Sequence, residues 1–562
     1  MEPKKFKSLL ISDFNSDVLR GYLNNDEASP LIEAVAAPFG QTMRVLVDKK
    51  SECWRQDYDF VVVWTQPESV IESFGKKTAY LDIGAKDILH EVDEFCSALL
   101  GLRERTRYIF VPTWAAPAYN RGYGMLDMKH NFGIENILMQ MNLRVSQNLD
   151  KASNIYLLNA ERWIRLLGKD AFNPKLWYMA KIPFGNEVFA QAMKEIKASL
   201  SALSGGSKKI IILDLDETLW GGVAGEIGWQ NINLGGHDPV GEAYVDFQRT
   251  LKAMTGRGIL LGIVSKNEER IALEAIKNHP EMALRLEDFA GWRINWEDKA
   301  RNIVDLVSGL KLTLQSAVFI DNNPAEREFI RMSLPGVLVP EWPDDKMYYK
   351  KALLSLSCFD TASVTREDLE RNRMYVTERE RQGLKGRVNS LDEWLRALAT
   401  KVEVQELNET NLQRAAQLLN KTSQMNLATR RMTEDELTKW ARGDNRKLWT
   451  FRVSDKFGDS GLTGIVSIED DGAQLARIID FVLSCRVIGR GIEEAMLHVA
   501  VEHARSIGLK EVSAGYVPTS KNKPCLDFWK RSGFLSDSAA EQFRWMAKDK
   551  YPIPEHMHIA RR

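Results

Sequence analysis

Four short apolar runs between residues 208 and 341, separated by helical patterns, constrain the fold of this chain more than any other feature. Such alternation predicts a parallel α/β sheet in the middle of the chain. In a sheet of this kind the binding site lies at the carboxyl ends of the strands. Polar residues end the first three runs, so we expect their side chains to meet in one crevice. The runs are IIILDLD, GILLGIVSK, SAVFIDN and GVLVPE.

The side chains around these strand ends form a pattern typical of phosphoryl transfer. Asp214 and Asp216 stand two apart on an extended segment and so point the same way, while Asp321 ends a neighbouring strand. Carboxylate oxygens are ligands that Mg²⁺ prefers, and one carboxylate can attack phosphorus while the next transfers a proton. We expect Ser265 and Lys299 to bind the phosphoryl oxygens. Helix capping alone would explain a lone DxD pair, but not this ordered set.

The set resembles the motifs of the haloacid dehalogenase (HAD) superfamily. Asp214 to Thr218 match its DxDxT motif, and the next three motifs match Ser265, Lys299 and Asp321. The resemblance implies that Asp214 is the nucleophile and Asp216 the acid/base. The chain departs from the family in the last motif, which is commonly a pair of acids, because Asp321 is followed by Asn322. An amide adds no charge, so metal binding could be weaker. The expected Mg²⁺ ligands are Asp214, Asp216, Asp321 and Asn322.

The spacing of these motifs leaves no room for a large lid. A HAD site without a cap stays open and can accept a substrate that is attached to a macromolecule. The glycine-rich insert 219–236 is expected to form a small flap, because glycines permit close backbone approach. A surface hairpin without function is the alternative.

The C-terminal part resembles the fold of GCN5-related acetyltransferases (GNAT). A buried strand at 477–485 is followed by an RxxGxG pattern that enters a helix, where backbone N–H groups can bind a pyrophosphate. A further strand, EVSAGYVP, and the segment NKPCLDFWKRSGF complete the likeness. CoA and an acyl carrier protein present the same phosphopantetheine arm, so the fold does not decide between them. The expected binding residues are Arg486, Gly489, Arg490 and Gly491.

Taken together, four sequence segments resemble those of the FkbH-like proteins of polyketide biosynthesis, and the likeness covers most of the chain. The resemblance implies an enzyme that takes 1,3-bisphosphoglycerate, removes phosphate and loads the glyceryl group on an acyl carrier protein. The segments are DLDETLWGGVAGE, IDNNPAERE, NKTSQMN followed by TRR, and SCRVIGR.

A cysteine thiol can hold an acyl group as a thioester intermediate before the group is transferred to the carrier thiol. Cys485 is our hypothesis, because it ends a strand beside Arg486 and a helix N-terminus, which both favour a thiolate. A buried structural cysteine is the alternative. Cys525 is the second candidate, although its helical neighbours favour core packing.

The N-terminal part resembles an SGNH-type hydrolase that has lost its catalytic residues. The segment SLLISDFN at 8–15 lies where that fold places its nucleophile. The segment DAFNPKLW at 170–177 lies where that fold places its acid and its histidine. Phe14 replaces the serine and Asn173 the histidine, so hydrolysis would lack both nucleophile and base. We expect a docking or structural role.

The chain of 562 residues therefore predicts an α/β multidomain protein. Its parts are an SGNH-like α/β domain, a HAD Rossmann-like parallel sheet, a helical connector and a GNAT-like α+β domain, at 1–200, 205–350, 351–399 and 400–562. A net charge of −1 argues against a nucleic-acid or membrane-surface binder. Five dispersed cysteines without a CxxC pair, no signal-peptide pattern and no apolar run long enough for a span favour the cytoplasm.

Two other functions remain open at this stage. A phosphatase joined to a CoA-dependent N-acetyltransferase would turn over acetyl-CoA without a carrier. A non-catalytic scaffold would not need the complete set of motif residues. The sequence leaves the pathway product, the cognate carrier and the oligomeric state open.

Overall fold

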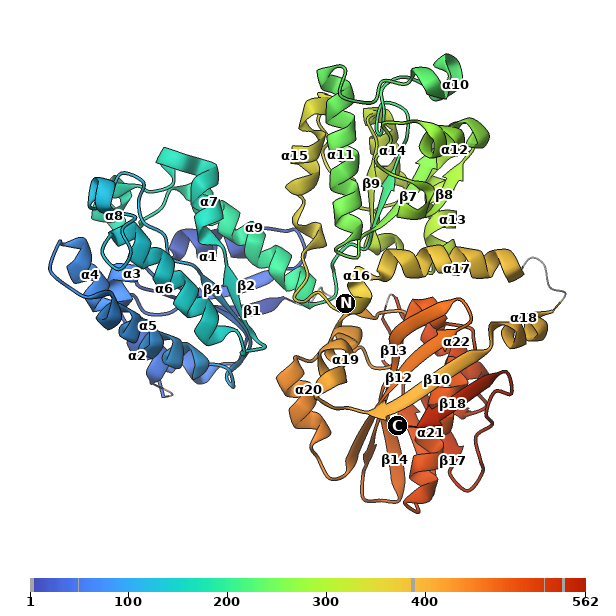
Figure 1. The fold of residues 1–562 in the computed structure, drawn as a ribbon. Coiled ribbons are helices and arrows are strands. Elements are labelled where there is room, and N and C mark those ends of the chain that lie inside the picture. Colours follow the sequence, from blue (N-terminus) through green and yellow to red (C-terminus); the bar gives the residue numbers. More distant parts are fainter. Residues whose placement is uncertain (1–4, 49, 386–389, 520, 538–540, 562) are drawn as a thin grey trace. The chain divides into compact units, whose positions relative to one another are not determined.

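The computed structural model describes residues 5–48, 50–385, 390–519, 521–537 and 541–561. The chain forms two compact units, residues 1–200 and 201–562 (Figure 1). The second unit contains two separate sheets, so the domains predicted at 205–350 and 400–562 are parts of one compact unit. The α/β multidomain fold class is confirmed.

The first unit is built around a parallel sheet with the strand order β2-β1-β3-β4-β5. Its interior strands β1, β3 and β4 are buried along most of their length, because strands covered on both faces need continuous apolar runs. The bounds are β1 Phe6–Ser12, β2 Ile32–Ala36, β3 Tyr58–Trp64, β4 Thr106–Pro112 and β5 Ile155–Leu158, with the longer helices α1 Asp17–Asn25, α5 Ala85–Leu100, α6 Ile134–Leu149 and α9 Asn186–Leu203.

The middle of the chain folds into a second parallel sheet, with the strand order β8-β7-β6-β9. Every residue of β6, β7 and β9 is buried, as expected for the first three apolar runs. The strands are β6 Ile210–Leu213, β7 Leu260–Ser265, β8 Phe289–Ile294 and β9 Ala317–Ile320, and the main helices are α11 Pro239–Thr255, α12 Glu269–Asn278, α13 Lys299–Gly309 and α14 Pro324–Ser333.

The fourth strand of this sheet is not the predicted one. The segment GVLVPE makes only an isolated bridge, from Leu338 to Val318. The fourth strand is β8, FAGWRI, which was missed because the half-exposed Gly291, Trp292 and Arg293 interrupt its apolar run, as suits an edge strand. Pro340 removes a backbone donor from the predicted strand, which disfavours continued pairing.

Most described residues of the connector at 351–399 are helical, as predicted, although 360–365 are not, and residues 386–389 lie outside the described residues. Helix α17 contacts β8 of the middle sheet and β13 of the C-terminal sheet, and Figure 1 shows it running between the two. The helices that begin in or overlap this stretch are α15 Tyr349–Leu354, α16 Arg366–Leu369, α17 Arg371–Lys385 and α18 Leu391–Leu398.

The C-terminal part forms a mixed sheet with the strand order β16-β17-β15-β14-β13-β12-β10-β18. Neighbouring strands are antiparallel except for the pairs β14 with β15 and β10 with β18. The strands predicted at 477–485 and at EVSAGYVP correspond to β14 and β15, and NKPCLDFWKRSGF contains α22. The bounds are β10 Thr400–Glu406, β11 Met425–Asn426, β12 Arg446–Asp455, β13 Gly458–Asp470, β14 Leu475–Leu483, β15 Glu511–Gly515, β16 Leu535–Asp537, β17 Gln542–Met546 and β18 Met557–Arg561, with α19 Glu409–Lys421, α20 Glu434–Ala441, α21 Ile492–Ser506 and α22 Lys523–Arg531.

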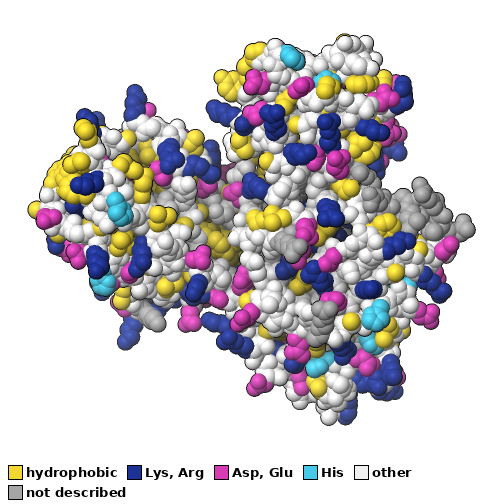
Figure 2. All heavy atoms as spheres, viewed as in Figure 1, with side chains coloured by type: hydrophobic (Ala, Val, Ile, Leu, Met, Phe, Trp, Pro, Cys, Tyr) yellow, Lys and Arg dark blue, Asp and Glu magenta, His cyan; other side chains and the backbone are white. Residues whose placement is uncertain are grey.

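Charges of both signs are mixed over the face of the molecule shown in Figure 2. This distribution agrees with the near-balance of acidic and basic residues in the sequence. In the part of the chain that the structure describes, no helix is both long and apolar enough to cross a membrane.

Candidate active site

Two buried aspartates lie side by side at the carboxyl edge of the middle sheet. Asp214 follows β6 and Asp321 follows β9, and the two strands are paired in parallel with Leu213 opposite Ile320. The backbone N–H of Asp214 donates to the carbonyl of Ile320 at 3.1 Å, which continues the pairing one residue further. Asp214 is 7% exposed and Asp321 is fully buried. The predicted convergence of strand ends is therefore present.

Lys299 joins these two carboxylates. It is the first residue of α13, which begins after the N-cap Asp298. Its Nζ lies 3.0 Å from Asp214 Oδ1 and 2.7 Å from Asp321 Oδ2. Burial acts to lower the pKa of Lys299, but the two carboxylates outweigh burial and raise it. Burial and the nearby Asp214 raise the pKa of Asp321 to about 6, although Lys299 acts in the opposite direction.

Asp216 has a different environment from Asp214. One of its oxygens accepts from the Trp220 indole at 2.8 Å and from the Ala224 amide at 3.1 Å, and the other from Asn267 Nδ2 at 2.8 Å. Burial raises the pKa of Asp216 in spite of these donors. A carboxyl with a raised pKa suits the predicted acid/base role. Both oxygens of the Asp216 carboxylate accept from these donors, and its predicted use as a metal ligand stays a prediction.

Ser265 and Asn322 complete the predicted set. Ser265 ends β7, the neighbour of β6, and is 2% exposed. Asn322 is tied to Thr218, whose hydroxyl donates to its side-chain oxygen at 3.3 Å and accepts from its backbone N–H at 3.2 Å. The guanidinium of Arg327 donates to the carbonyls of Asp321 and Asn322, which fixes this turn.

The donor set fits Mg²⁺ when two carboxylates are sufficient. Within the described residues, no group of three or more His, Cys, Asp and Glu is arranged to hold a metal. Magnesium is commonly held by one or two carboxylates, with waters and substrate phosphates as the other ligands. Asp214 and Asp321 are the side chains that would hold it here.

Three contributing residues were not singled out by the sequence analysis: Asn267, Arg327 and Trp220. Asn267 lies two residues beyond Ser265, so its place at a strand end was the available signal. Trp220 is fully buried within the glycine-rich insert, and Gly221 of that insert pairs with Asn233. The insert is therefore packed against the domain through its first residues.

The predicted glycine-rich binding loop differs from expectation. The amide of Gly489 is not free, because it donates to Glu493 Oε1 at 2.8 Å. Arg490 is 1% exposed, and its guanidinium pairs with Asp455 at 3.1 Å and with Glu378. Arg490 therefore contributes to packing rather than to a solvent-facing binding site, and the prediction of free N–H groups fails at Gly489.

The other residues predicted to act in this region are Gly491, Cys485 and Arg486. Gly491 has a φ of +82°, and a Cβ there would lie 2.9 Å from the ring of His556, so glycine is required. Cys485 is half-buried, with its Sγ 3.6 Å from the hydroxyl of Tyr375. Cys485 was expected beside the N-terminus of a helix. Helix α21 begins only at Ile492, so Cys485 does not lie at the N-terminus of this helix. Burial, reinforced by nearby cations, lowers the pKa of Arg486.

The second candidate thiol has the surroundings of a core residue. Cys525 is fully buried, and burial raises its pKa to about 12. This agrees with the packing role that its helical neighbours indicated.

In the first unit, the two positions that lack catalytic residues have structural roles. Phe14 is buried and packs edge-on against Trp64 and Phe184, with ring centroids 5.4 and 5.6 Å apart. Asn173 caps α8 (Pro174–Ala180) by accepting from the amide of Leu176. The SGNH-like assignment itself stays a prediction.

Comparison with known proteins finds likeness at the level of structure. No protein-family model matches the chain, and no curated protein is similar to it in sequence. It is similar to the N-terminal part of the protein BF1531 from Bacteroides fragilis, which contains a phosphatase domain and was crystallised with Mg. The two are 27% identical with a TM-score of 0.58, over 64% of this chain and 95% of that one.

Acetyltransferases are also among the similar structures. An IAA acetyltransferase from Bacillus cereus is 16% identical over 24% of this chain and 79% of its own, with a TM-score of 0.19. A GNAT-family acetyltransferase from Staphylococcus aureus is 8% identical over 26% and 99%, with a TM-score of 0.21. Values this low say nothing about activity.

Proposed function

We propose that this chain is a Mg²⁺-dependent HAD-type enzyme that removes phosphate from 1,3-bisphosphoglycerate and transfers the glyceryl group to an acyl carrier protein. The observation that carries the proposal is the buried cluster of Asp214, Lys299 and Asp321 at the carboxyl edge of the middle sheet. The likeness to a Mg-bound phosphatase-domain structure supports the phosphoryl-transfer part. The carrier and the substrate rest on the resemblance to FkbH-like proteins.

The chemistry of the substrate sets the order of the steps. If Asp214 attacked the acyl phosphate at phosphorus, the acyl group would leave as a free carboxylate and lose its activation. The acyl carbon must therefore first be attacked by a thiolate, which breaks the bond between carbon and the phosphate oxygen and releases inorganic phosphate. The product is a 3-phosphoglyceryl thioester.

Thioester exchange moves the phosphoglyceryl group to the carrier thiol, and its phosphate ester is then the substrate of the aspartate site. The Asp214 carboxylate attacks phosphorus, and the ester oxygen leaves with a proton from Asp216. Asp216 next accepts a proton from water, whose oxygen attacks the aspartyl phosphate and regenerates Asp214. Lys299 offsets negative charge in both steps, and bound Mg²⁺ would add a Lewis acid at the phosphoryl oxygens. The glyceryl group then remains on the carrier thiol.

Cys485 is the proposed thiol, because it is half-buried and lines a cavity together with Lys209, Lys311 and Arg486. Cys485→Ala should then abolish acylation of the protein by 1,3-bisphosphoglycerate, as measured by intact mass. Undiminished acylation would exclude this role for Cys485.

The decisive experiment incubates the protein with Mg²⁺, 1,3-bisphosphoglycerate and a holo carrier protein, and weighs the carrier. A glyceryl mass increment is expected with the wild type. With Asp214→Asn, thioester formation should continue but the phosphate should remain, so the adduct is phosphoglyceryl. Lys266→Met, which changes an exposed pair with Glu326 near the site, is the control and should give the glyceryl increment.

Two outcomes would contradict the proposal. Absence of any increment on the carrier would exclude the transfer. Acetylation of an amine by acetyl-CoA, without need for a carrier, would instead support a phosphatase joined to a CoA-dependent N-acetyltransferase.

A further inference from the structure

A cavity lined by basic side chains lies in the second unit. Its volume is about 80 Å³, and no Asp or Glu is among the described residues that line it. Thr313, Ser316, Ser423 and Gln424 add hydroxyl and amide groups to its wall. We call it the basic cavity, and its cationic residues are Lys209, Lys311, Arg371, Arg414, Lys421 and Arg486.

The basic cavity is distinct from the aspartate site because the two lie at opposite edges of the middle sheet. Lys209 directly precedes β6, whereas Asp214 directly follows it. Ser316, which also lines the cavity, and Asp321 directly precede and follow β9 in the same way. At about 3.3 Å per residue along a strand, roughly 16 Å separates Lys209 from Asp214. A ligand of the basic cavity would therefore not contact the catalytic aspartates through its bound group.

Three of the cations have neutral contacts. Lys209 Nζ donates to the carbonyl of Lys421 at 3.1 Å, and Lys311 Nζ to the carbonyl of Ile488 at 2.9 Å. The guanidinium of Arg486 donates to Ser484 Oγ at 3.2 Å and contacts the sulfur of Met374. These contacts satisfy donors, but none of them supplies a negative charge.

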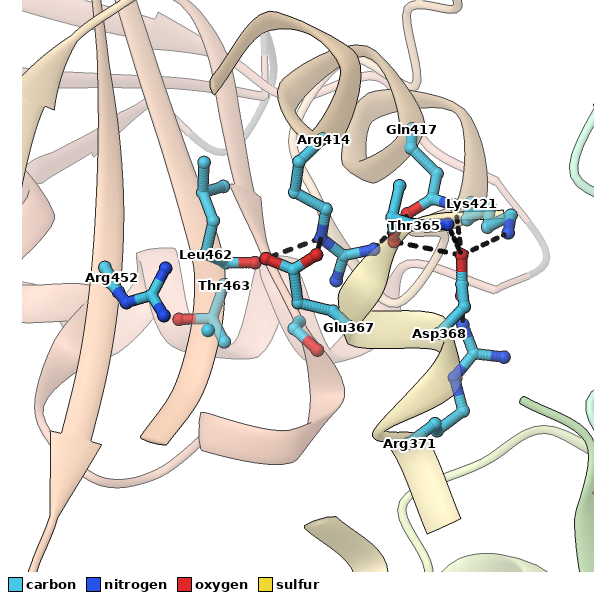
Figure 3. A network of polar contacts seen from close by, with 12 residues as sticks. Thr365, Glu367, Asp368, Arg371, Arg414, Gln417, Lys421, Arg452, Leu462 and Thr463 are labelled. Atoms are coloured by element: carbon cyan, nitrogen blue, oxygen red, sulfur yellow. Dashed lines mark hydrogen bonds and ion pairs between the residues drawn. The ribbon is translucent and has the colours of Figure 1, made fainter. Parts of the chain in front are cut away.

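The other three cations share two carboxylates, as Figure 3 shows. Asp368 pairs with Arg371 and, at 3.4 Å, with Lys421. Glu367 lies 4.0 Å from the Nε of Arg414. Within the described residues, six cations thus have two carboxylates in ion-pair contact, which leaves a surplus of four positive charges around one cavity.

Such a surplus is costly in a partly buried site. Burial, together with the neighbouring cations, lowers the pKa of Lys209 and of Lys421 to about 8 and that of Arg414 to about 10. Buried charges are normally paired or bound to a ligand of opposite sign. An anion in the cavity would relieve the repulsion, and the planar guanidinium of an arginine can donate two hydrogen bonds to two oxygens of a phosphate.

We propose that the basic cavity binds the phosphate group of a small phosphorylated ligand, whose negative charges balance the surplus cations. A second cavity, of about 290 Å³, adjoins it and shares Lys311, Tyr375 and Arg486. Trp292, Leu306, Leu310 and Met374 line that second cavity, so it can take an apolar body attached to the phosphate. A phosphate ester with an apolar body should therefore bind more tightly than inorganic phosphate.

The test measures binding to the full chain in EDTA at constant ionic strength, with inorganic phosphate, pyrophosphate and phenyl phosphate as probes. A saturable rise in melting temperature is expected with each, and phenyl phosphate should bind more tightly than inorganic phosphate. Lys209→Met with Arg486→Gln should weaken the apparent Kd at least tenfold. Its matched control is Lys447→Met with Arg477→Gln, which removes two exposed cations of the same unit and should leave binding unchanged.

A second measurement needs no variant. Lys209 and Lys421 should react readily with acetic anhydride at pH 8, and the phosphate probes should protect both of them severalfold. Equal Kd values in the two double variants, or labelling that ligand does not change, would overturn the proposal. Weakening by Ser265→Ala instead would place the phosphate at the aspartate site and would also overturn it.

Discussion

Lys299→Met should be the most damaging single substitution in the middle sheet. It removes the cation that lies 3.0 Å from Asp214 and 2.7 Å from Asp321, and it leaves two buried carboxylates facing each other. Removing one partner of a buried ion pair typically costs about 3–5 kcal/mol, because the remaining charge has no compensation. Loss of a group that stabilises transition-state charge should also lower kcat for phosphate release by about 10²–10³.

The destabilisation should depend on pH in a defined direction. The folded pKa of Asp321 is already raised to about 6 and should rise further without Lys299. An acid whose folded pKa lies above its unfolded value destabilises the fold as pH rises through that range. The variant should therefore be least stable above pH 7 and should recover part of the loss near pH 5, where one carboxyl is protonated.

Amide hydrogen exchange of β6 and β9 measures this locally, so the rest of the chain does not obscure it. Lys266→Met is the matched control, since an exposed pair such as Lys266 with Glu326 is worth less than about 1 kcal/mol. If Lys299→Met exchanged like the control and kept phosphate release within tenfold of wild type, the role assigned to Lys299 would be refuted.

Three further substitutions test other parts of the structure. Burial raises the pKa of Asp13 to about 7, so its ionisation destabilises the first unit as pH rises from 4 to 7, and Asp13→Asn should raise stability at pH 8 by about 2 kcal/mol in thermal unfolding. Phe14→Ala should cost about 3–5 kcal/mol in the same assay, through loss of its packing against Trp64, with phosphate release unaffected at a temperature where the variant is folded. Asp216→Asn should slow phosphate release at least 10²-fold and remove one limb of its pH profile, while retaining Mg²⁺ binding by calorimetry.

The sequence was sufficient for much of the middle sheet. Strands β6, β7 and β9 are continuous apolar runs, and their polar ends must converge because all three strands are parallel. The same logic placed Asp214 beside Asp321. Strand β8 was not predicted because, as an edge strand, it has three half-exposed residues, Gly291, Trp292 and Arg293, that interrupt its apolar run.

The basic cavity could not be predicted in this way. Its cations come from strand ends, the connector and the C-terminal sheet, and no local pattern reports that these segments meet. Arg490 likewise contacts residues from distant segments, Glu378 of the connector and Asp455 of the C-terminal sheet. Arg490 was expected to bind a ligand, but its side chain is packed in the interior instead. Spacing predicts neighbours along one sheet, whereas packing between sheets depends on side-chain contacts across the whole unit.

The most direct test of the central claim is to trap the phosphorylated enzyme. The protein is mixed with 3-phosphoglyceryl thioester and Mg²⁺, quenched in acid within a turnover, and its peptides are mapped by mass spectrometry. A phosphoryl group on Asp214 is expected, absent when EDTA replaces Mg²⁺ and absent in Asp214→Asn. Phosphate release without any phosphoryl group on Asp214, or undiminished release by Asp214→Asn, would contradict the account.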